Sequence, residues 1–179
     1  MPLILLIGGA RSGKSQLALR LASEQSSPVV FIATAQAGDS EMAERIALHR
    51  RARPDWQTIE EPLRLRETIE SVKEDTCLVV DCLTLWTANA LEALGTADAE
   101  AQAAAAAEVA SARPGLTVAV TNEVGLGIVP DNPLGRSYRD LLGHVNTIWA
   151  DAADQAYLLV AGRALTLSRT ASLIEGQPQ

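Results

Sequence analysis

Cysteine and aromatic residues are scarce in this sequence, and each scarcity argues against certain kinds of structure or binding site. The two cysteines, Cys77 and Cys82, are too few for a disulfide framework or a four-cysteine zinc site. Both lie in or beside an apolar run, so we expect reduced, buried thiols. Aromatic residues make up 3% of the chain, and they do not suggest a broad stacking platform for a large flat ligand.

Long apolar runs and a secretion signal are also missing. The run at residues 3–7 has no basic residue before it and is ended by glycines, unlike a signal peptide. No stretch approaches the roughly 20 apolar residues that span a bilayer. We therefore expect a cytoplasmic protein without a membrane span.

Positive charge is in deficit, because 15 Lys and Arg stand against 22 Asp and Glu, for a formal net charge of −7. Nucleic-acid binding needs net or patchy positive charge, so we expect no nucleic-acid partner, although a local basic patch could bind one small anion. The chain has 179 residues, 47% of them hydrophobic and 21% charged, which is typical of a globular protein. We expect one domain over residues 1–179.

Apolar runs alternate with helix-like segments, which predicts an α/β fold with a doubly wound, mainly parallel sheet and flanking helices. Strands are expected at residues 3–7, 28–33, 77–81, 116–121 and 157–160, with 164–167 as a hairpin partner. Helices are expected at residues 16–22, 40–53, 63–74, 84–94, 97–112 and 134–153. The alanine-rich segment 97–112 offers little to pack, so we expect it on the surface. Ligands of such sheets bind at the carboxyl ends of the strands.

Residues 8–15 match the phosphate-binding P-loop pattern, and the expected nucleotide contacts are Gly8, Gly9, Ala10, Arg11, Ser12, Gly13, Lys14 and Ser15. The glycines let backbone N–H groups point at phosphate oxygens, and the helix that follows adds the positive end of its dipole. Lys14 is expected to reach the outer phosphates and Ser15 to ligate Mg²⁺. The buried strand before the motif and the helix after it predict a P-loop NTPase-like (RecA-like) sheet. The alternative is a glycine-rich turn that binds nothing.

An acidic residue, Asp81, closes the apolar strand at residues 77–81. An acid at this position faces the phosphates in P-loop enzymes and holds Mg²⁺ directly or through water. The alternative role is to cap the helix that begins near Thr84.

The segment 45–53 carries four arginines and a histidine in an otherwise acidic chain. On a helix, Arg45, His49 and Arg53 share one face. Such a cluster suggests a second phosphate contact, and it lowers the pKa of the histidine because neighbouring positive charge disfavours the imidazolium. A neutral imidazole beside a bound phosphate is a potential nucleophile. The spacing alone leaves this hypothesis level with a solvated basic face and an incidental histidine.

Two other polar segments are candidates for substrate contact. Glu60 and Glu61 could accept hydrogen bonds from a guanine edge or a ribose, or be surface charge. Residues 122–130 form a loop shaped by two glycines and a proline at a strand end. It is either a substrate contact or a structural turn.

Taken together, these motifs resemble the bifunctional adenosylcobinamide kinase / adenosylcobinamide-phosphate guanylyltransferase family of cobalamin biosynthesis. The resemblance is carried, in order, by residues 8–15, 32–35, 39–46, 49, 53–54, 56–62, 80–86, 121–130 and 135–146. It covers most of the chain apart from the alanine-rich segment.

The resemblance implies two reactions. ATP or GTP first phosphorylates the aminopropanol hydroxyl of adenosylcobinamide. GTP then transfers GMP to adenosylcobinamide phosphate through a GMP–histidine intermediate on His49, while Lys14, the loop amides and Mg²⁺ neutralise phosphate charge. Further nucleotide contacts are implied at Ala33, Thr34, Ala35, Arg50, Arg51, Ala52, Arg53, Glu60 and Asp81. Ser15 and Asp81 are the implied Mg²⁺ ligands, and a homotrimer is implied.

Two other readings remain open at this point. The chain could be a P-loop kinase of another small metabolite, in which His49 is only a phosphate contact. It could instead be a nucleotide-dependent binding or switch protein without transferase activity. A covalent GMP adduct would separate both from the bifunctional enzyme.

Overall fold

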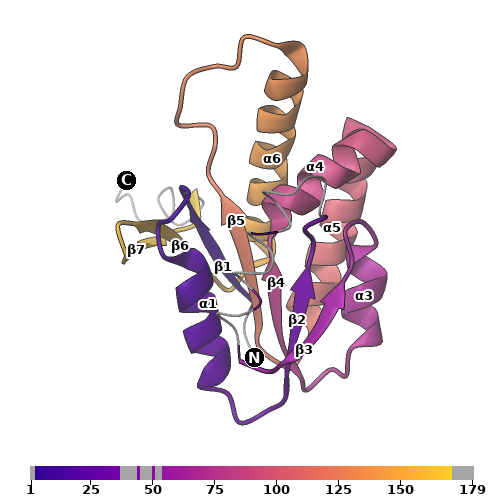
Figure 1. The fold of residues 1–179 in the computed structure, drawn as a ribbon, viewed down its shortest axis with the longest axis vertical. Coiled ribbons are helices and arrows are strands. Elements are labelled where there is room, and N and C mark those ends of the chain that lie inside the picture. The colour runs from indigo at the N-terminus through magenta and orange to yellow at the C-terminus, as the bar shows by residue number, and fades with distance from the viewer. Residues whose placement is uncertain (1–2, 37–43, 45–49, 51–53, 171–179) are drawn as a thin grey trace, which may run out of the picture.

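The computed structural model of this 179-residue chain describes residues 3–36, 44, 50 and 54–170 (Figure 1). The strands are β1 (Leu3–Gly8), β2 (Val29–Ala33), β3 (Gln57–Glu60), β4 (Cys77–Asp81), β5 (Thr117–Asn122), β6 (Gln155–Val160) and β7 (Arg163–Leu167). The helices are α1 (Lys14–Ser23), α3 (Leu65–Ser71), α4 (Leu83–Leu94), α5 (Thr96–Ala112) and α6 (Pro133–Ala152). Within these residues the strands form one seven-stranded sheet in the order β3-β2-β4-β5-β1-β6-β7.

Neighbouring strands pair in parallel throughout this sheet, except that β7 runs antiparallel to β6. The predicted mainly parallel α/β sheet is therefore confirmed. The predicted strands at 3–7, 28–33, 77–81, 116–121, 157–160 and 164–167 correspond to β1, β2, β4, β5, β6 and β7. Of the predicted helix at 40–53, only Glu44 and Arg50 are described, and both are helical.

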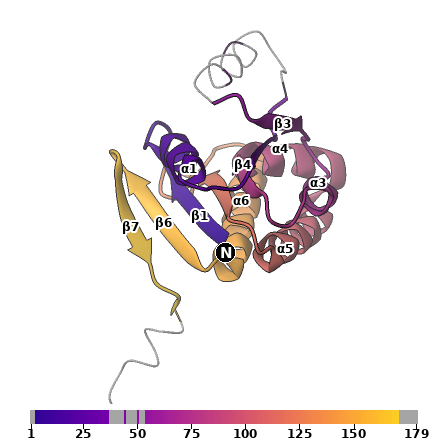
Figure 2. The same ribbon diagram turned by 90° about the horizontal axis from the view of Figure 1, so that it is seen from below.

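Helices cover the two faces of the sheet unequally, with α1 on one face and α3, α4, α5 and α6 on the other (Figure 2). Side chains of β1 alternate between these layers. Ile4 and Leu6 pack in the cluster that contains Ala18 of α1, whereas Leu3 and Leu5 pack toward the four-helix layer. A strand that is buried on both faces needs apolar side chains at every position, and this explains the continuous apolar run of β1. None of the described helices is long and apolar enough to cross a membrane.

Helix α5 corrects the expectation of a surface helix at residues 97–112. It packs against both α3 and α6, and five of its alanines are buried: Ala99, Ala103, Ala106, Ala107 and Ala110. Alanine has little side chain to remove from water, so its burial leaves a weak signal in the sequence. Small side chains nevertheless let neighbouring helix backbones approach closely, and this is how α5 joins the core.

The short strand β3 was not predicted. Its side chains are exposed or half-buried, because it lies at the edge of the sheet and pairs only with β2 among the described strands. An edge strand of four residues carries no apolar run to mark it. This strand sets the position of Glu60, because the pairing register places Glu60 directly beside Ala33 at the end of β2.

A buried guanidinium fixes the connection between α3 and β4 on the amino side of the sheet. Arg113 is 6% exposed. Its Nη1 donates to the carbonyl oxygens of Ile69 and Val72 at 3.1 and 2.9 Å. Its Nη2 donates to those of Lys73 and Thr76 at 2.6 and 3.0 Å. These bonds hold the last turn of α3 and the segment that leads from it to β4 around one guanidinium group.

The substitution Arg113→Ala is expected to lower the free energy of unfolding by about 3 kcal/mol, because four carbonyl groups lose a charged donor. Urea unfolding measured by circular dichroism gives this value. Arg66→Ala is the control, since Arg66 forms an exposed ion pair with Glu70 and its loss should leave the transition almost unchanged. Equal midpoints for the two variants would contradict the role assigned to Arg113.

Candidate active site

The carboxyl ends of five parallel strands meet at one edge of the sheet. In the pairing register Glu60 lies opposite Ala33, and Ala33 lies opposite Asp81. β5 lies between β4 and β1, and in its pairing with β1 Asn122 lies opposite Gly8. The ends of β3, β2, β4, β5 and β1 thus bring residues predicted as site residues from widely separated parts of the chain into one row.

The P-loop connects β1 to α1 by a turn with a special backbone conformation. Gly13, the N-cap of α1, has a φ of 101°, in the left-handed region that favours glycine. A Cβ atom on Gly8 would overlap the carbonyl oxygen of Leu159 on β6. Glycine is required at both positions, at one for its φ and at the other for the close approach of β6.

Lys14 lies inside the turn that it follows. Its side chain is buried, and its Nζ donates to the carbonyl oxygens of Gly8 and Gly9 at 2.9 and 2.7 Å and contacts Ser12 Oγ at 3.4 Å. Burial lowers the pKa of Lys14, while the nearby Cys82 and Asp81 act in the opposite direction. The ammonium group is thus held in the concave side of the loop, where phosphate oxygens bind in P-loop proteins.

The turn between β6 and β7 supports the P-loop from a distant part of the sequence. The backbone N–H of Gly162 donates to the carbonyl oxygen of Ser12 at 3.0 Å. A Cβ atom on Gly13 would lie 3.4 Å from the Cα atom of Gly162. This contact could not be predicted from local sequence, because only the position of β6 beside β1 brings the hairpin to the loop.

Asp81 and Ser15 fit the donor set that Mg²⁺ prefers. Asp81 ends β4 half-buried, and its charge partly opposes the lowering of the pKa of Lys14 that burial causes. Ser15 is the second residue of α1. Among the described residues no group of three His, Cys, Asp or Glu side chains could hold a metal. Mg²⁺ bound to nucleotides uses one or two protein oxygens together with phosphate and water, and these two residues match that need.

Thr34 joins the ends of β2 and β4. Its fully buried hydroxyl donates to the carbonyl oxygen of Cys82 at 2.6 Å and accepts from the N–H of Cys82 at 2.9 Å. Burial raises the pKa of the Cys82 thiol to about 11, so this cysteine stays protonated and is a poor nucleophile. The loop after β2, which includes the half-buried Ala35, is thereby anchored beside Asp81.

The end of β5 is fixed by side chains that sequence reasoning did not single out. Thr84 Oγ1 accepts from the N–H of Asn122 at 2.7 Å, and Asn146 Nδ2 donates to the carbonyl oxygen of Asn122 at 3.0 Å. Asn146 Oδ1 accepts from Thr121 Oγ1 at 2.7 Å. The hydroxyl of Tyr138 donates to the carbonyl oxygen of Thr84 at 3.2 Å, and burial raises the pKa of Tyr138 to about 12. These contacts hold the start of the loop at residues 122–130 next to the P-loop.

Glu60 forms an ion pair with Arg50, and each side chain is about half exposed. This pair links one residue of the predicted arginine cluster to the end of β3. The candidates His49, Arg51, Ala52 and Arg53 lie outside the described residues.

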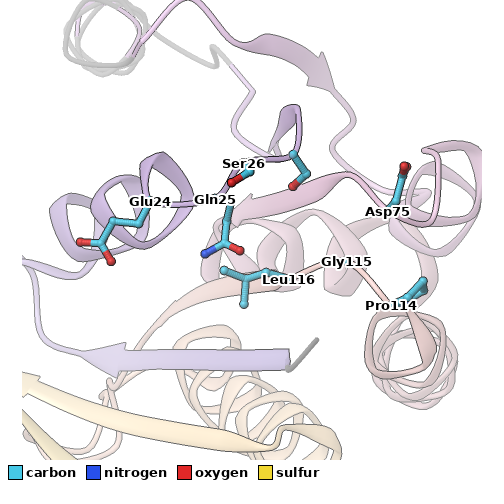
Figure 3. A pocket seen from close by; sticks show the side chains of 8 residues that line it. Glu24, Gln25, Ser26, Asp75, Pro114, Gly115 and Leu116 are labelled. Carbon is cyan, nitrogen blue, oxygen red and sulfur yellow. The ribbon is translucent and has the colours of Figure 1, made fainter.

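A cavity of about 320 Å³ lies at the other end of the sheet, beside the amino ends of the strands (Figure 3). It is lined by residues 24–27, Asp75 and residues 114–116, which precede β2, β4 and β5. No predicted site residue lines it. It is therefore separate from the phosphate-binding loop at the carboxyl ends of the strands.

The substitution Lys14→Ala is expected to weaken binding of a nucleoside triphosphate by at least about 100-fold, because the loop loses its buried cation. Isothermal titration calorimetry with GTP measures this change. The chain contains one other lysine, Lys73, which is exposed. Lys73→Ala is therefore the matched control and should bind normally, and wild-type affinity in Lys14→Ala would contradict the assignment.

Structural similarity supports the P-loop architecture. A protein from Pyrococcus horikoshii OT3 superposes with a TM-score of 0.56 at 9% sequence identity, covering 92% of this chain and 85% of that chain. An ATPase from a type III secretion system of pathogenic bacteria superposes with a TM-score of 0.54 at 15% identity, covering 99% of this chain and 54% of that chain. At these identities the likeness concerns the fold alone, and the predicted P-loop NTPase-like fold class is confirmed.

Sequence similarity is more specific. The chain is 46% identical over 165 residues to the bifunctional adenosylcobalamin biosynthesis protein CobP of Pseudomonas aeruginosa, covering 91% of this chain and 95% of that protein. It is 40% identical over 177 residues to the bifunctional adenosylcobalamin biosynthesis protein CobU of Escherichia coli, covering 89% and 96%. The family model described as cobinamide kinase / cobinamide phosphate guanyltransferase matches residues 4–167. The chain belongs to this CobU family.

Proposed function

We propose that this chain carries both activities of its family: phosphorylation of adenosylcobinamide by ATP or GTP, and transfer of GMP from GTP to adenosylcobinamide phosphate. The observation that carries the proposal is the row of strand ends at one edge of the sheet. The P-loop, Asp81 and Glu60, which forms an ion pair with Arg50, lie along that edge. Family membership over residues 4–167 supports the same assignment.

In the phosphorylation step, we assign Lys14 and the N–H groups of residues 8–15 to the outer phosphates. The acceptor hydroxyl attacks the γ-phosphorus and loses its proton, and the bond from that phosphorus to the β-phosphate oxygen breaks. Positioned cationic and N–H donors stabilise the charge that spreads over the transferred group. Mg²⁺ held by Ser15 and Asp81 would neutralise phosphate charge when bound.

In the guanylyl-transfer step, we assign the nucleophile to His49. A neutral ring nitrogen of His49 attacks the α-phosphorus of GTP, a P–N bond forms, and pyrophosphate leaves. A phosphate oxygen of adenosylcobinamide phosphate then attacks the same phosphorus, the P–N bond breaks, and adenosylcobinamide-GDP is released. Arg50 directly follows His49 in the sequence and forms an ion pair with Glu60 at the end of β3. This ion pair supports the assignment.

The remaining nucleotide contacts follow from the same arrangement. We assign Ala33, Thr34, Ala35, Arg50, Arg51, Ala52, Arg53, Glu60 and Asp81 to GTP, in addition to residues 8–15. Glu60 ends β3 with an exposed carboxylate, which is suited to accept hydrogen bonds from a guanine edge. The single domain over residues 1–179, the homotrimer and the cytoplasmic location stay predictions.

Incubation with GTP and Mg²⁺ is expected to add one GMP to the protein, and acid is expected to remove it, because a phosphoramidate is acid-labile. Intact-protein mass spectrometry measures both changes. The chain contains two histidines, His49 and His144. His49→Ala should show no adduct. His144→Ala should show the full adduct, since His144 Nδ1 lies 2.7 Å from Oε1 of Glu100 on α5, a helix that carries no predicted site residue.

Absence of the adduct in the wild-type protein, with GTP binding measured separately, would contradict guanylyl transfer. The chain would then be a kinase of another kind if it phosphorylated an acceptor. It would be a nucleotide-dependent switch if it did not.

The substitution Asp81→Asn is expected to lower the Mg²⁺-dependent rates of both reactions by about 100-fold, because one anionic ligand is lost. Rates measured over a Mg²⁺ titration test this, and a higher Mg²⁺ requirement should accompany the loss. Asp75→Asn is the control, since Asp75 is exposed at the opposite end of β4. An unchanged Mg²⁺ dependence in Asp81→Asn would exclude Asp81 as a ligand.

A further inference from the structure

Glu123, the first residue after β5, leaves the sheet directly beside the P-loop. Its backbone N–H donates to the carbonyl oxygen of Gly8 at 3.2 Å, so the pairing of β5 with β1 continues one residue beyond the end of β5. The same oxygen accepts a hydrogen bond of 2.9 Å from Nζ of Lys14. The backbone of Glu123 and the ammonium group assigned to the outer phosphates are therefore neighbours across one atom.

Strand order distinguishes Glu123 from the other carboxylates that follow or end strands at this edge. Glu60 ends β3 and Asp81 ends β4, and neither of these strands is adjacent to β1. β5 is adjacent to it, and in the pairing of β4 with β5 Asp81 lies opposite Val120, three residues before Glu123. Glu123 thus stands beyond Asp81 along the strand direction and comes from the strand that pairs with β1, which leads into the P-loop.

Contacts on both sides of Glu123 fix its position. Asn122, the preceding residue, is held by Thr84 and Asn146 through its N–H and its carbonyl oxygen. Glu123 is half-buried, and its Oε1 accepts a hydrogen bond from the N–H of Gly125. A Cβ atom on Gly125 would lie 2.9 Å from that oxygen, so the missing side chain makes room for the carboxylate. A carboxylate held in this way is suited to act on one particular proton.

We propose that Glu123 is the general base of the phosphorylation step. The inference deepens the proposed function and rests on its first reaction. The acceptor hydroxyl oxygen forms a bond to the γ-phosphorus, and its proton passes to a carboxylate oxygen of Glu123. The bond from the γ-phosphorus to the β-phosphate oxygen breaks, and the nucleoside diphosphate leaves. A carboxylate accepts the hydroxyl proton in the same way in protein kinases.

The chemistry of the two reactions makes this base specific to one of them. Phosphorylation has a hydroxyl group as its nucleophile, and a hydroxyl group must lose a proton. A neutral imidazole attacks with the lone pair of its unprotonated nitrogen, and an ionised phosphate attacks with an oxygen that is already anionic. Loss of the base should therefore slow phosphorylation and spare GMP transfer, although both reactions use the same P-loop.

The test is Glu123→Gln, because the amide has the same size and its oxygen can still accept from the N–H of Gly125. The kcat of adenosylcobinamide phosphorylation is expected to fall by at least about 100-fold, whereas GMP–protein formation, read by intact mass, should stay within about threefold of wild type. GTP affinity, measured by calorimetry, should not weaken, because a negative charge beside the phosphates is removed. Glu24→Gln is the matched control and should leave both rates unchanged, since Glu24 is exposed at the amino ends of the strands.

Two further variants carry the test if the glutamine variant does not fold. Glu123→Asp keeps a carboxylate on a shorter side chain, and Glu123→Ala removes the carboxylate together with its bond to Gly125. For a base, the aspartate variant should retain more phosphorylation than the alanine variant, while both form the GMP adduct.

Three outcomes would overturn the inference. Phosphorylation near the wild-type rate in Glu123→Gln would show that the carboxylate accepts no proton in this step. A parallel fall of phosphorylation and GMP–protein formation in that variant would show a structural role at the shared P-loop. Absence of adenosylcobinamide phosphate with the wild-type protein would overturn the proposed first reaction itself, and this control distinguishes that failure from the other two.

Discussion

Parallel pairing is the constraint on which the rest of this structure depends. Because β1 pairs in parallel with both β5 and β6, and β4 pairs in parallel with β2 and β5, these strands end at the same edge. Parallel neighbours need crossover connections, and the resulting helices bury both faces of the sheet. The polar residues that follow each apolar run therefore gather at one place, and this is where the P-loop lies.

Side chains from the helices complete that edge. Where a strand ends, its backbone groups lose ladder partners and must find others. Thr84 and Asn146 satisfy Asn122 at the end of β5, and Asn89 satisfies Thr34 after β2. Helix side chains thus replace sheet hydrogen bonds at the positions where the chain turns away to form the site, and the loops start from fixed points.

The arrangement separates a shared phosphate site from the segment proposed to accept GMP. The P-loop, with Lys14 held inside it, is built from β1 and α1 and supported by Gly162 of the β6–β7 turn. The segment that carries His49 leaves and re-enters the sheet at the ends of β2 and β3. One triphosphate site can serve two different sets of reacting groups. This is a physical basis for two reactions at phosphorus in one small domain.

Features with a local cause could be predicted from the order of the residues. Continuous apolar runs predicted the doubly buried strands, and glycine spacing before Lys14 predicted a phosphate-binding turn because backbone bending there is a property of neighbouring residues. The resemblance of the motifs predicted the family, which the comparisons confirm. The roles of His49, Asp81 and Glu60 stay predictions, and His49 lies outside the described residues.

Features that join distant residues depend instead on how the whole chain packs. The edge strand β3 has no apolar run, and the alanines of α5 show no periodic contrast, so packing rather than pattern places both. The contact of Gly162 with Ser12 and the bridge from Asn89 to Thr34 and Pro62 depend on which strands are neighbours. Strand order is set by burial of the whole sheet, and no local stretch of sequence contains it.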